Sequence, residues 1–268
     1  MAKYEYDALT GDVHDDGLLV LTMRRPKQYN AWRPSEFVDV ADALTKAAAD
    51  ERVIVVVLTG EGKFFSSGAD LKASAGLKMD SADALRAHFN RSTKLVTDTL
   101  IDFPKVAIAA LNGPVVGLPA AILPLFDVVY AAEGASLSLP FTTLAINSEG
   151  AASFSLPLAV GLSNAGEMLI LAKPQTSKDL LQKGLVSRVF PNETFEKEVL
   201  AIAHDAAKLP RNSLLANKRL LRAPIKKQLH DAINNEVEGL IERFLAGEPQ
   251  QVFAAFAAGS KAFSKPKL

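Results

Sequence analysis

The sequence predicts an α/β fold, with a mixed core over residues 1–192 and a helical region over residues 193–268. Short apolar runs typical of strands alternate with helical patterns in the first region, and consecutive helical patterns fill the second. The 268 residues are 49% apolar and 22% charged, a balance typical of a globular chain that can bury a core. We therefore expect one large α/β core with a helical appendage.

Four apolar runs in the first region are expected to form strands. They cover residues 17–24, 53–58, 106–111 and 128–131. The second and third are continuous apolar runs, without the alternation of polar and apolar residues that marks a half-exposed strand. Such runs suit strands whose two faces are both covered by other elements.

Helical patterns separate and follow these strands. Residues 35–49 place apolar side chains on one face, and Pro34 and Ser35 supply a suitable start. Further helices are expected over 81–100 and 119–126, and in the second region over 193–209, 213–221, 225–245 and 250–263. Pro124 conflicts with a helix that begins at Pro119, because an internal proline costs about 3 kcal/mol or bends the helix.

Charge and composition exclude several classes of function. The 30 basic and 30 acidic residues balance, so the chain lacks the net positive charge of a general nucleic-acid or membrane-surface binder. It has no cysteine, and its four histidines lie far apart in the sequence, so thiol chemistry and a metal site are not expected. The uncharged stretch 106–126 contains three prolines, which argues against a membrane-spanning helix, and the polar N-terminus argues against secretion.

One acid stands out in a stretch that is almost free of charge. Residues 134–166 contain a single charged side chain, Glu149, where about seven would be expected at the average of the chain. Burial among small and apolar neighbours would raise the pKa of this carboxyl group and make it a general base near neutral pH. The alternative is an ordinary Glu near a helix N-terminus, where it would interact with the helix dipole.

Two glycine-containing turns follow predicted strands. Residues 60–71 follow the second strand, and residues 112–119 follow the third. Neither has the spacing of a dinucleotide or Walker phosphate-binding loop. Because Pro119 suits the first turn of a helix, the N–H of Leu118 would remain free at its positive end, where it could stabilise negative charge on an oxygen. Most turns of this kind are only turns, so this feature alone is weak.

Taken together, these segments resemble the crotonase superfamily, the enoyl-CoA hydratases and isomerases. The resemblance rests on RPKQYNA (25–31), KFFSSGADL (63–71), NGPVVGL (112–118), FDVVY (126–130) and GLVSRVF (184–190), and it extends from about residue 15 to the end. It implies a spiral of repeated ββα units, with a C-terminal helical region that mediates trimers or hexamers. It also implies an acyl-CoA thioester as the substrate, with no separate cofactor.

The resemblance assigns candidate roles to individual residues. The backbone N–H groups of Ala69 and Leu118 match the two donors that hold the thioester oxygen. The other expected substrate contacts are Ser67, Gly68, Asp70 and Leu71 along the pantetheine arm, Lys27 and Lys261 at the CoA phosphates, and Phe256 in the last helix. Asp70 is interpreted as a structural residue that caps a helix behind the Ala69 donor.

Departures from the family pattern narrow the expected reaction. Ala121 and Phe141 stand where hydratases carry their two catalytic glutamates, so the resemblance argues against hydration. Glu149 remains, and NSEGAASFSLPL (147–158) is similar to the catalytic segment of peroxisomal, fungal-type Δ3-Δ2-enoyl-CoA isomerases. The resemblance thus implies that Glu149 is the single acid–base residue of an isomerase in the β-oxidation of unsaturated fatty acids.

The sequence leaves two alternative functions open, and it contains a possible targeting signal. The chain could be a Δ3,5-Δ2,4-dienoyl-CoA isomerase, which should need a second acid facing Glu149, or an acyl-CoA-binding member without turnover. The C-terminal Pro266, Lys267 and Leu268 are close to the Ser-Lys-Leu signal that a peroxisomal import receptor recognises. They predict a location in the peroxisomal matrix, although a solvated basic tail would look the same.

Overall fold

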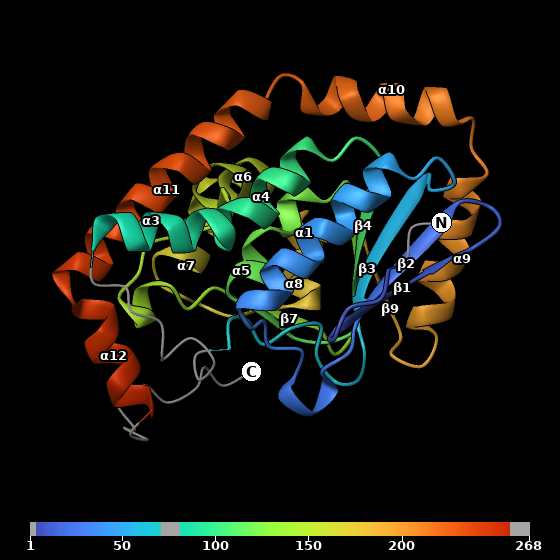
Figure 1. Ribbon diagram of the computed structural model, residues 1–268. Helices are drawn as coiled ribbons and strands as arrows, with labels where there is room; N and C mark the ends of the chain where they lie inside the picture. Colours follow the sequence, from blue (N-terminus) through green and yellow to red (C-terminus); the bar gives the residue numbers. More distant parts are fainter. Residues whose placement is uncertain (1–3, 71–80, 258–268) are drawn as a thin grey trace.

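The computed structural model, which describes residues 4–70 and 81–257, contains a six-stranded sheet (Figure 1). Its strands follow one another in the order β1-β2-β3-β4-β6-β9. They are β1 (Leu9–Val13), β2 (Leu18–Met23), β3 (Val55–Gly60), β4 (Val106–Leu111), β6 (Val128–Ala132) and β9 (Arg188–Phe190). β1 pairs antiparallel with β2, and every other pairing in this sheet is parallel.

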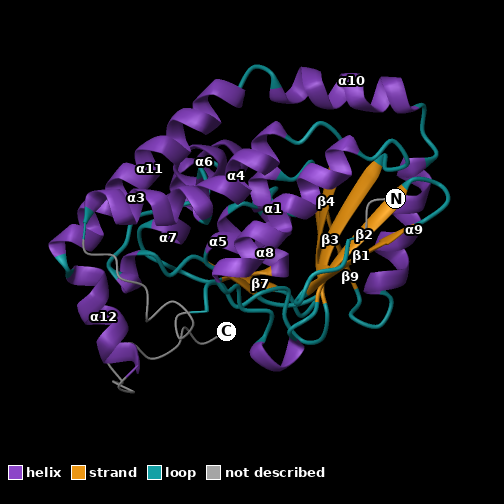
Figure 2. Ribbon diagram, in the orientation of Figure 1, coloured by secondary structure: helices purple, strands orange, loops and turns teal. Residues whose placement is uncertain are grey.

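The central strands are covered on both faces, as their apolar runs predict. Val55 and Val57 of β3 pack in a cluster with helix α9 (Phe195–Ala207), whereas Val56 and Leu58 pack in the larger cluster with helix α1 (Pro34–Ala49). Because successive side chains of a strand point to opposite faces, an all-apolar run serves both clusters. The sheet therefore carries helices on each side (Figure 2).

The sequence patterns did not predict the three helices within residues 152–182 or several short strands. β5 (Val115–Val116), β7 (Ser136–Ser138) and β8 (Gln175–Thr176) form a second, three-stranded sheet. These strands are two or three residues long, and β1 contains Gly11 and Asp12, so none of them has an extended apolar pattern. Parallel pairing of β5 with β7 nevertheless matters for function, since it places the turn after β5.

The helix predicted over 81–100 is two helices. α3 (Ala82–Arg91) begins at Ser81, whose hydroxyl accepts a hydrogen bond from the N–H of Ala84, and α4 (Thr93–Asp102) follows directly. Ser92 breaks the continuity because its φ of −122° and ψ of −101° are not helical. After this break, α4 packs against α1, and Thr93 is the first residue of the new helix.

The helix predicted over 119–126 is also shorter than expected, which removes the difficulty with Pro124. α5 (Leu118–Ala121) ends after four residues, and a separate 3-10 turn covers Leu123–Leu125. Pro119 and Pro124 each lie in the first turn of their own short element, where a missing N–H leaves no helical hydrogen bond unmade. Neither proline therefore bends a longer helix.

The C-terminal half is mostly helical. Its helices are α6 (Ala152–Val160), α7 (Leu162–Leu169), α8 (Ser177–Gln182), α9, α10 (Arg211–Arg222), α11 (Lys226–Ala246) and α12 (Glu248–Ala257). α10 extends along one edge of the molecule and leads into α11, which packs against α3, α4 and α6 (Figure 1). The helical appendage is thus in contact with the core, and α11 lies beside the segment that contains Glu149.

A buried cluster of charges ties α10 to the sheet. The Nζ atom of Lys218 lies 2.8 Å from the carboxylate of Asp127, and Arg222 reaches the same carboxylate at 3.4 Å. The backbone N–H of Ala107 also donates to Asp127, at 2.8 Å. Asp127 precedes β6, so the cluster connects α10 to the edge where β4 and β6 are joined.

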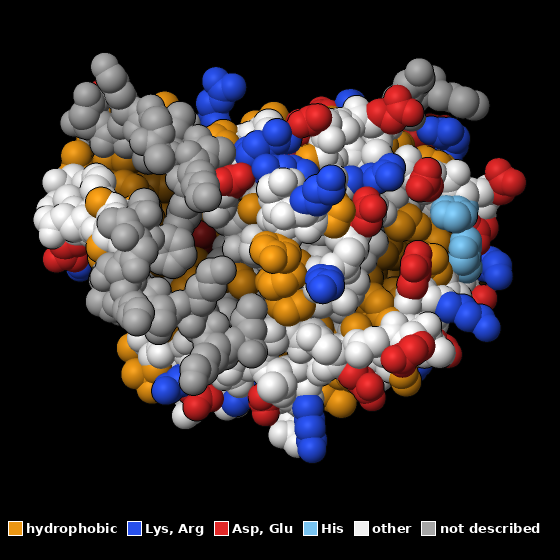
Figure 3. All heavy atoms as spheres, turned by 90° about the horizontal axis from the view of Figure 1, so that it is seen from below, with side chains coloured by type: hydrophobic (Ala, Val, Ile, Leu, Met, Phe, Trp, Pro, Cys, Tyr) orange, Lys and Arg blue, Asp and Glu red, His pale blue; other side chains and the backbone are white. Residues whose placement is uncertain are grey.

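The surface carries charges of both signs. On the face in Figure 3, Lys and Arg side chains are interspersed with Asp and Glu, as expected from the zero net charge. Within residues 4–70 and 81–257, no helix is both long enough and apolar enough to span a bilayer. In the same ranges, no three His, Asp or Glu side chains cluster closely enough to hold a metal ion.

Candidate active site

The two predicted donor turns lie side by side. Ser66, in the turn after β3, pairs in parallel with Val115 of β5, which joins the two segments. A Cβ atom on Gly117 would lie 3.7 Å from the Cα of Gly68, and one on Gly68 would lie 3.0 Å from the carbonyl oxygen of Val116. Both glycines also have positive φ angles, of 89° at Gly68 and 66° at Gly117. Their lack of side chains permits this close approach of the two backbones.

The N–H of Ala69 points away from its neighbouring strand. On either side of Ala69, the carbonyl of Gly68 accepts from the N–H of Trp32 at 2.8 Å, and the N–H of Asp70 donates to the carbonyl of Trp32 at 2.8 Å. In this parallel pairing, the peptide groups of Ala69 itself face the other way. Ala69 is exposed, and within the described residues its N–H has no acceptor.

The N–H of Leu118 is free for a different reason. Leu118 is the first residue of α5, so its N–H has no partner inside the helix. The adjacent Gly117 donates to the carbonyl of Ser138 at 3.0 Å, and its carbonyl accepts from Ala120 and Ala121, which fixes the turn. No acceptor for the Leu118 N–H occurs in residues 4–70 or 81–257. The helix N-terminus adds a positive partial charge at this point.

Glu149 lies close to the second donor turn. A Cβ atom on the next residue, Gly150, would lie 3.0 Å from Cδ1 of Leu118 and 3.1 Å from Cβ of Ala121. The segment that carries Glu149 therefore packs directly on α5. Ala121 and Phe141, which the resemblance places at the two glutamate positions of the hydratases, are both buried. Neither side chain can exchange a proton.

The surroundings of Glu149 favour the protonated acid more than water does. The residue as a whole is half-buried, but desolvation of its carboxyl group raises its pKa from 4.5 to about 7. The hydroxyl of Thr93, at the start of α4, donates to the carboxylate at 2.9 Å and opposes this shift. The nearby carboxylate of Glu236 raises the pKa further, and no cation among the described residues pairs with Glu149. A carboxyl group with this pKa can accept and return a proton near pH 7.

Glu236, on α11, is a site residue that the sequence reading missed. It is 4% exposed, and its carboxylate accepts hydrogen bonds from the N–H groups of Ala151 and Ser153. The signal was present, because Glu236 lies seven residues after Leu229 and four before Leu240 on the apolar face of the predicted helix. A charge on that face predicts either a buried partner or a functional group.

The remaining predicted substrate contacts are only partly described. Lys27 lies exposed in the 3-10 turn Pro26–Gln28, and Ser67 donates its N–H to the carbonyl of Tyr29 at 2.9 Å. Asp70 forms an ion pair with Arg25 at 3.2 Å. The helix that Asp70 was expected to cap would fall in residues 71–80, outside the described part. The predicted contacts Leu71 and Lys261 also lie outside it, as do Pro266, Lys267 and Leu268, and of Phe256 only the backbone in α12 is described.

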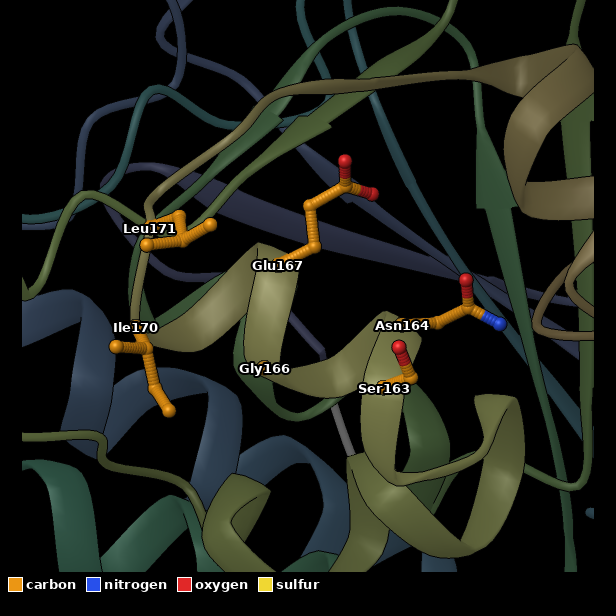
Figure 4. A pocket seen from close by; sticks show the side chains of 6 residues that line it. All are labelled: Ser163, Asn164, Gly166, Glu167, Ile170 and Leu171. Atoms are coloured by element: carbon orange, nitrogen blue, oxygen red, sulfur yellow. The ribbon is translucent and has the colours of Figure 1, made fainter.

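A surface hollow lies apart from these residues. It has a volume of about 580 Å³ and is formed by α7 and the residues that follow it (Figure 4). Its lining residues are Ser163, Asn164, Gly166, Glu167, Ile170 and Leu171. None of the predicted site residues is among them, so this hollow shares no residue with the predicted site around Glu149.

Comparisons with known proteins agree with the predicted family. A family profile described as enoyl-CoA hydratase/isomerase matches residues 14–263. Enoyl-CoA delta isomerase 2 of Rattus norvegicus is 36% identical over 95% of this chain, which spans 63% of the rat protein. Enoyl-CoA delta isomerase 3, peroxisomal, of Mus musculus is 35% identical over 85% of this chain and 72% of its own length.

Two further matches extend over nearly the whole of both proteins. A Delta(3,5)-Delta(2,4)-dienoyl-CoA isomerase of Pyricularia oryzae is 30% identical over 90% of this chain and 94% of its own length. The crystal structure of an enoyl-CoA hydratase/isomerase from Pseudoalteromonas atlantica T6c superimposes with a TM-score of 0.85 at 28% identity. That match covers 94% of this chain and 98% of the bacterial one.

Proposed function

Because this chain belongs to the enoyl-CoA hydratase/isomerase family, we propose that it is a Δ3-Δ2-enoyl-CoA isomerase. Its crotonase-type α/β fold is confirmed by the structural match, and several of its relatives are named enoyl-CoA delta isomerases. The proposed reaction moves the double bond of a 3-enoyl-CoA to the 2-trans position, as the β-oxidation of unsaturated fatty acids requires.

One observation carries this proposal. Glu149 lies in the segment that packs, through Gly150, against the turn that bears the Leu118 N–H, and its pKa of about 7 suits a reversible proton carrier. The two other positions at which the family's hydratases hold carboxylates are occupied by Ala121 and Phe141. Addition of water would need a second group to orient and activate the water molecule. Transfer of one proton within the substrate needs only one.

The proposed mechanism has two proton transfers through the same carboxylate. Ionised Glu149 removes a proton from the α-carbon, and the electron pair of the broken C–H bond forms a dienolate with its charge on the thioester oxygen. Protonated Glu149 then gives that proton to the γ-carbon on the same face, which forms the new C–H bond and leaves the double bond at the 2-position. Charge and atoms balance without a cofactor.

The N–H groups of Ala69 and Leu118 are proposed to hold the thioester oxygen during this step. Each such donor is worth on the order of 3 kcal/mol in the transition state, because it is oriented before the reaction begins. Ser67, Gly68, Asp70 and Leu71 would line the pantetheine arm, with Lys27 and Lys261 at the phosphates and Phe256 over the CoA. The N–H groups of Ala69 and Leu118 are free among the described residues, which supports the first part of this assignment.

Assembly and location are proposals of the same kind. Leu162, Ile170 and Leu171, around α7, are 79%, 68% and 63% exposed, which supports burial of this face in a homotrimer or hexamer. A monomeric mass in light scattering would contradict that.

Import into the peroxisomal matrix through Pro266, Lys267 and Leu268 is supported by the relative named as peroxisomal. If the protein stays in the peroxisome after deletion of Leu268, these residues are not its targeting signal.

The proposed function is tested with Glu149→Gln, which keeps the shape of the side chain and removes its proton transfer. We expect kcat for 3-hexenoyl-CoA to fall by several orders of magnitude, while the KM changes little because the donor turns are intact. Glu196→Gln is the matched control, since Glu196 is exposed in the first turn of α9, outside the predicted site, and its substitution should leave kcat unchanged. Comparable activity of the Glu149 variant would exclude it as the base. Faster hydration of a 2-enoyl-CoA than isomerisation of a 3-enoyl-CoA would exclude the isomerase.

A dienoyl-CoA isomerase is the second candidate, favoured by the fungal relative and by a second carboxylate beside Glu149. That carboxylate, Glu236, already accepts two backbone hydrogen bonds, so it is poorly placed to carry a proton. Faster turnover of a 3,5-dienoyl-CoA than of 3-hexenoyl-CoA would favour this candidate over the Δ3-Δ2 isomerase.

A further inference from the structure

Glu236 holds the start of α6 from a distant helix. Its Oε2 atom accepts from the N–H of Ala151 at 2.7 Å, and its Oε1 atom accepts from the N–H of Ser153 at 2.8 Å. Ala151 has a left-handed φ of 59°, and α6 has no capping side chain of its own. A carboxylate more than 80 residues away in sequence therefore satisfies two N–H groups that the helix itself leaves without partners.

Glu236 also contacts the chain segment that precedes Glu149. The side-chain amide of Asn147 donates to the backbone carbonyl of Glu236 at 3.0 Å. One turn further along α11, a Cβ atom on Gly239 would lie 3.1 Å from Oδ1 of Asn147, so a side chain there would crowd this contact. Glu236 thus binds the chain two residues before Glu149 and two and four residues after it.

We propose that Glu236 is a positioning residue for Glu149, which fixes the loop around it on both sides and places a second negative charge beside it. The inference rests on the proposed function of Glu149 as the proton carrier. It follows from geometry, because the three hydrogen bonds leave residues 148–150 as a short bridge between fixed points. A carboxylate that must reach two carbon atoms in turn gains from such a fixed backbone.

The electrostatic part of this role follows from what surrounds Glu149. On α4, the hydroxyl of Thr93 donates a hydrogen bond to the Glu149 carboxylate. The apolar side chains of Leu118 and Ala121 on α5 pack against the adjacent Gly150. On α11, the nearby charged group is the carboxylate of Glu236. Arg86 of α3 pairs with Glu238 at the surface instead. Burial raises the pKa of Glu236 itself, and its hydrogen bonds with Ser153, Ala151 and Ser148 oppose this shift. When Glu236 is ionised, its charge disfavours ionisation of Glu149.

The test is Glu236→Gln, which preserves the size of the side chain but removes the charge and one of the two acceptors. We expect kcat at pH 8 to fall about tenfold to a hundredfold with the KM within twofold, as for a misplaced catalytic group. We also expect the acidic limb of the pH profile to move to lower pH, because the neighbouring charge is gone. Glu242→Gln, six residues along α11 and exposed, is the control and should change neither quantity.

A second measurement does not depend on turnover. In protein labelled with 13C at glutamate carboxyl groups, the signal lost in Glu149→Gln identifies Glu149, and its titration midpoint should decrease in Glu236→Gln. Hydrogen exchange at Ala151 and Ser153 should become faster. An unchanged midpoint and unchanged exchange would overturn the inference while the proposed function stands. Absence of isomerase activity in the wild type would overturn the proposed function, and the titration would still decide the electrostatic effect of Glu236.

Discussion

Two half-buried acidic residues in this molecule, Asp127 and Glu149, have opposite surroundings. Asp127 lies between Lys218 and Arg222 and also accepts from the N–H of Ala107, so its charge is fully partnered. Glu149 has one hydroxyl and, as its charged neighbour, another carboxylate. The first arrangement suits a permanent charge that joins two elements. The second suits a group that changes its protonation state.

The difference shows how the fold separates stability from chemistry. The Asp127 cluster ties α10 to the strand edge at β6, and burial lowers the pKa of Lys218 while its pairing with Asp127 raises it. At Glu149, no cation among the described residues offsets the desolvation, and the Thr93 hydroxyl opposes it only in part. The C-terminal helices contribute to both regions, since α10 supplies the cations and α11 supplies Glu236. Variants in the two regions should therefore change stability with opposite signs.

The largest effect on stability is expected for Asp127→Ala. The substitution leaves the ammonium group of Lys218, only 7% exposed, without its carboxylate partner. Loss of one member of a buried ion pair typically costs about 3–5 kcal/mol, since the remaining charge stays desolvated. Urea denaturation should show this loss in the free energy of unfolding.

The control for that variant is a pair of the same kind on the surface. Asp205 and Lys208 approach to 3.2 Å, but their side chains are 81% and 63% exposed. Asp205→Ala should change the free energy of unfolding by less than about 1 kcal/mol, as exposed pairs generally do. Equal losses in the two variants would show that burial of the Asp127 cluster carries no special cost.

Glu149→Gln should have the opposite effect, and one that depends on pH. The pKa of Glu149 is raised in the folded protein, so below pH 4.5 the acid is protonated in both states and costs nothing. As pH rises from 4.5 to about 7, the unfolded chain ionises first and the folded state loses stability. Removing the ionisable group should therefore increase the free energy of unfolding at pH 8 by about 3 kcal/mol, corresponding to a shift from 4.5 to about 7.

Denaturation at two pH values checks this prediction. At pH 8 the Glu149→Gln variant should be more stable than the wild type, and at pH 4 the two should be nearly equal. Equal stability at both values would mean that Glu149 titrates as an exposed acid does, which would also remove the basis for its proposed role as a base at neutral pH.

Sequence patterns predicted the elements that are long and periodic. The four expected strands and α1 occur within about two residues of their predicted bounds, because extended apolar runs and a clear helical face leave few alternatives. The position of Glu149 followed from the lack of other charges around it, and its raised pKa agrees with that reasoning. Its catalytic role, and the donor roles of Ala69 and Leu118, stay predictions.

Features that depend on tertiary contact were not predictable in the same way. The break at Ser92 lies inside a continuous helical pattern, and it turns the chain so that Thr93 reaches Glu149. Glu236 meets Ala151 only because α11 docks on α6, which no local pattern specifies. The short β5 and β7 pair through their position in the chain path and not through their own propensity.

The smallest predicted effect concerns Thr93, the one residue among those described whose side chain donates to the Glu149 carboxylate. Thr93→Val keeps the shape of the side chain and removes that hydrogen bond. Because the bond favours the ionised form, its loss should raise the pKa of Glu149 and move the acidic limb of kcat/KM upward by about one pH unit, equivalent to about 1.4 kcal/mol.

Thr99→Val, on the same helix, is the matched control, since the Thr99 hydroxyl donates only to the carbonyl of Leu95. A limb that moves equally in both variants would reflect a general loosening of α4, and one that moves in neither would mean that Thr93 does not act on the base. A shift confined to Thr93→Val would show that a single hydroxyl limits how far desolvation raises the pKa of Glu149.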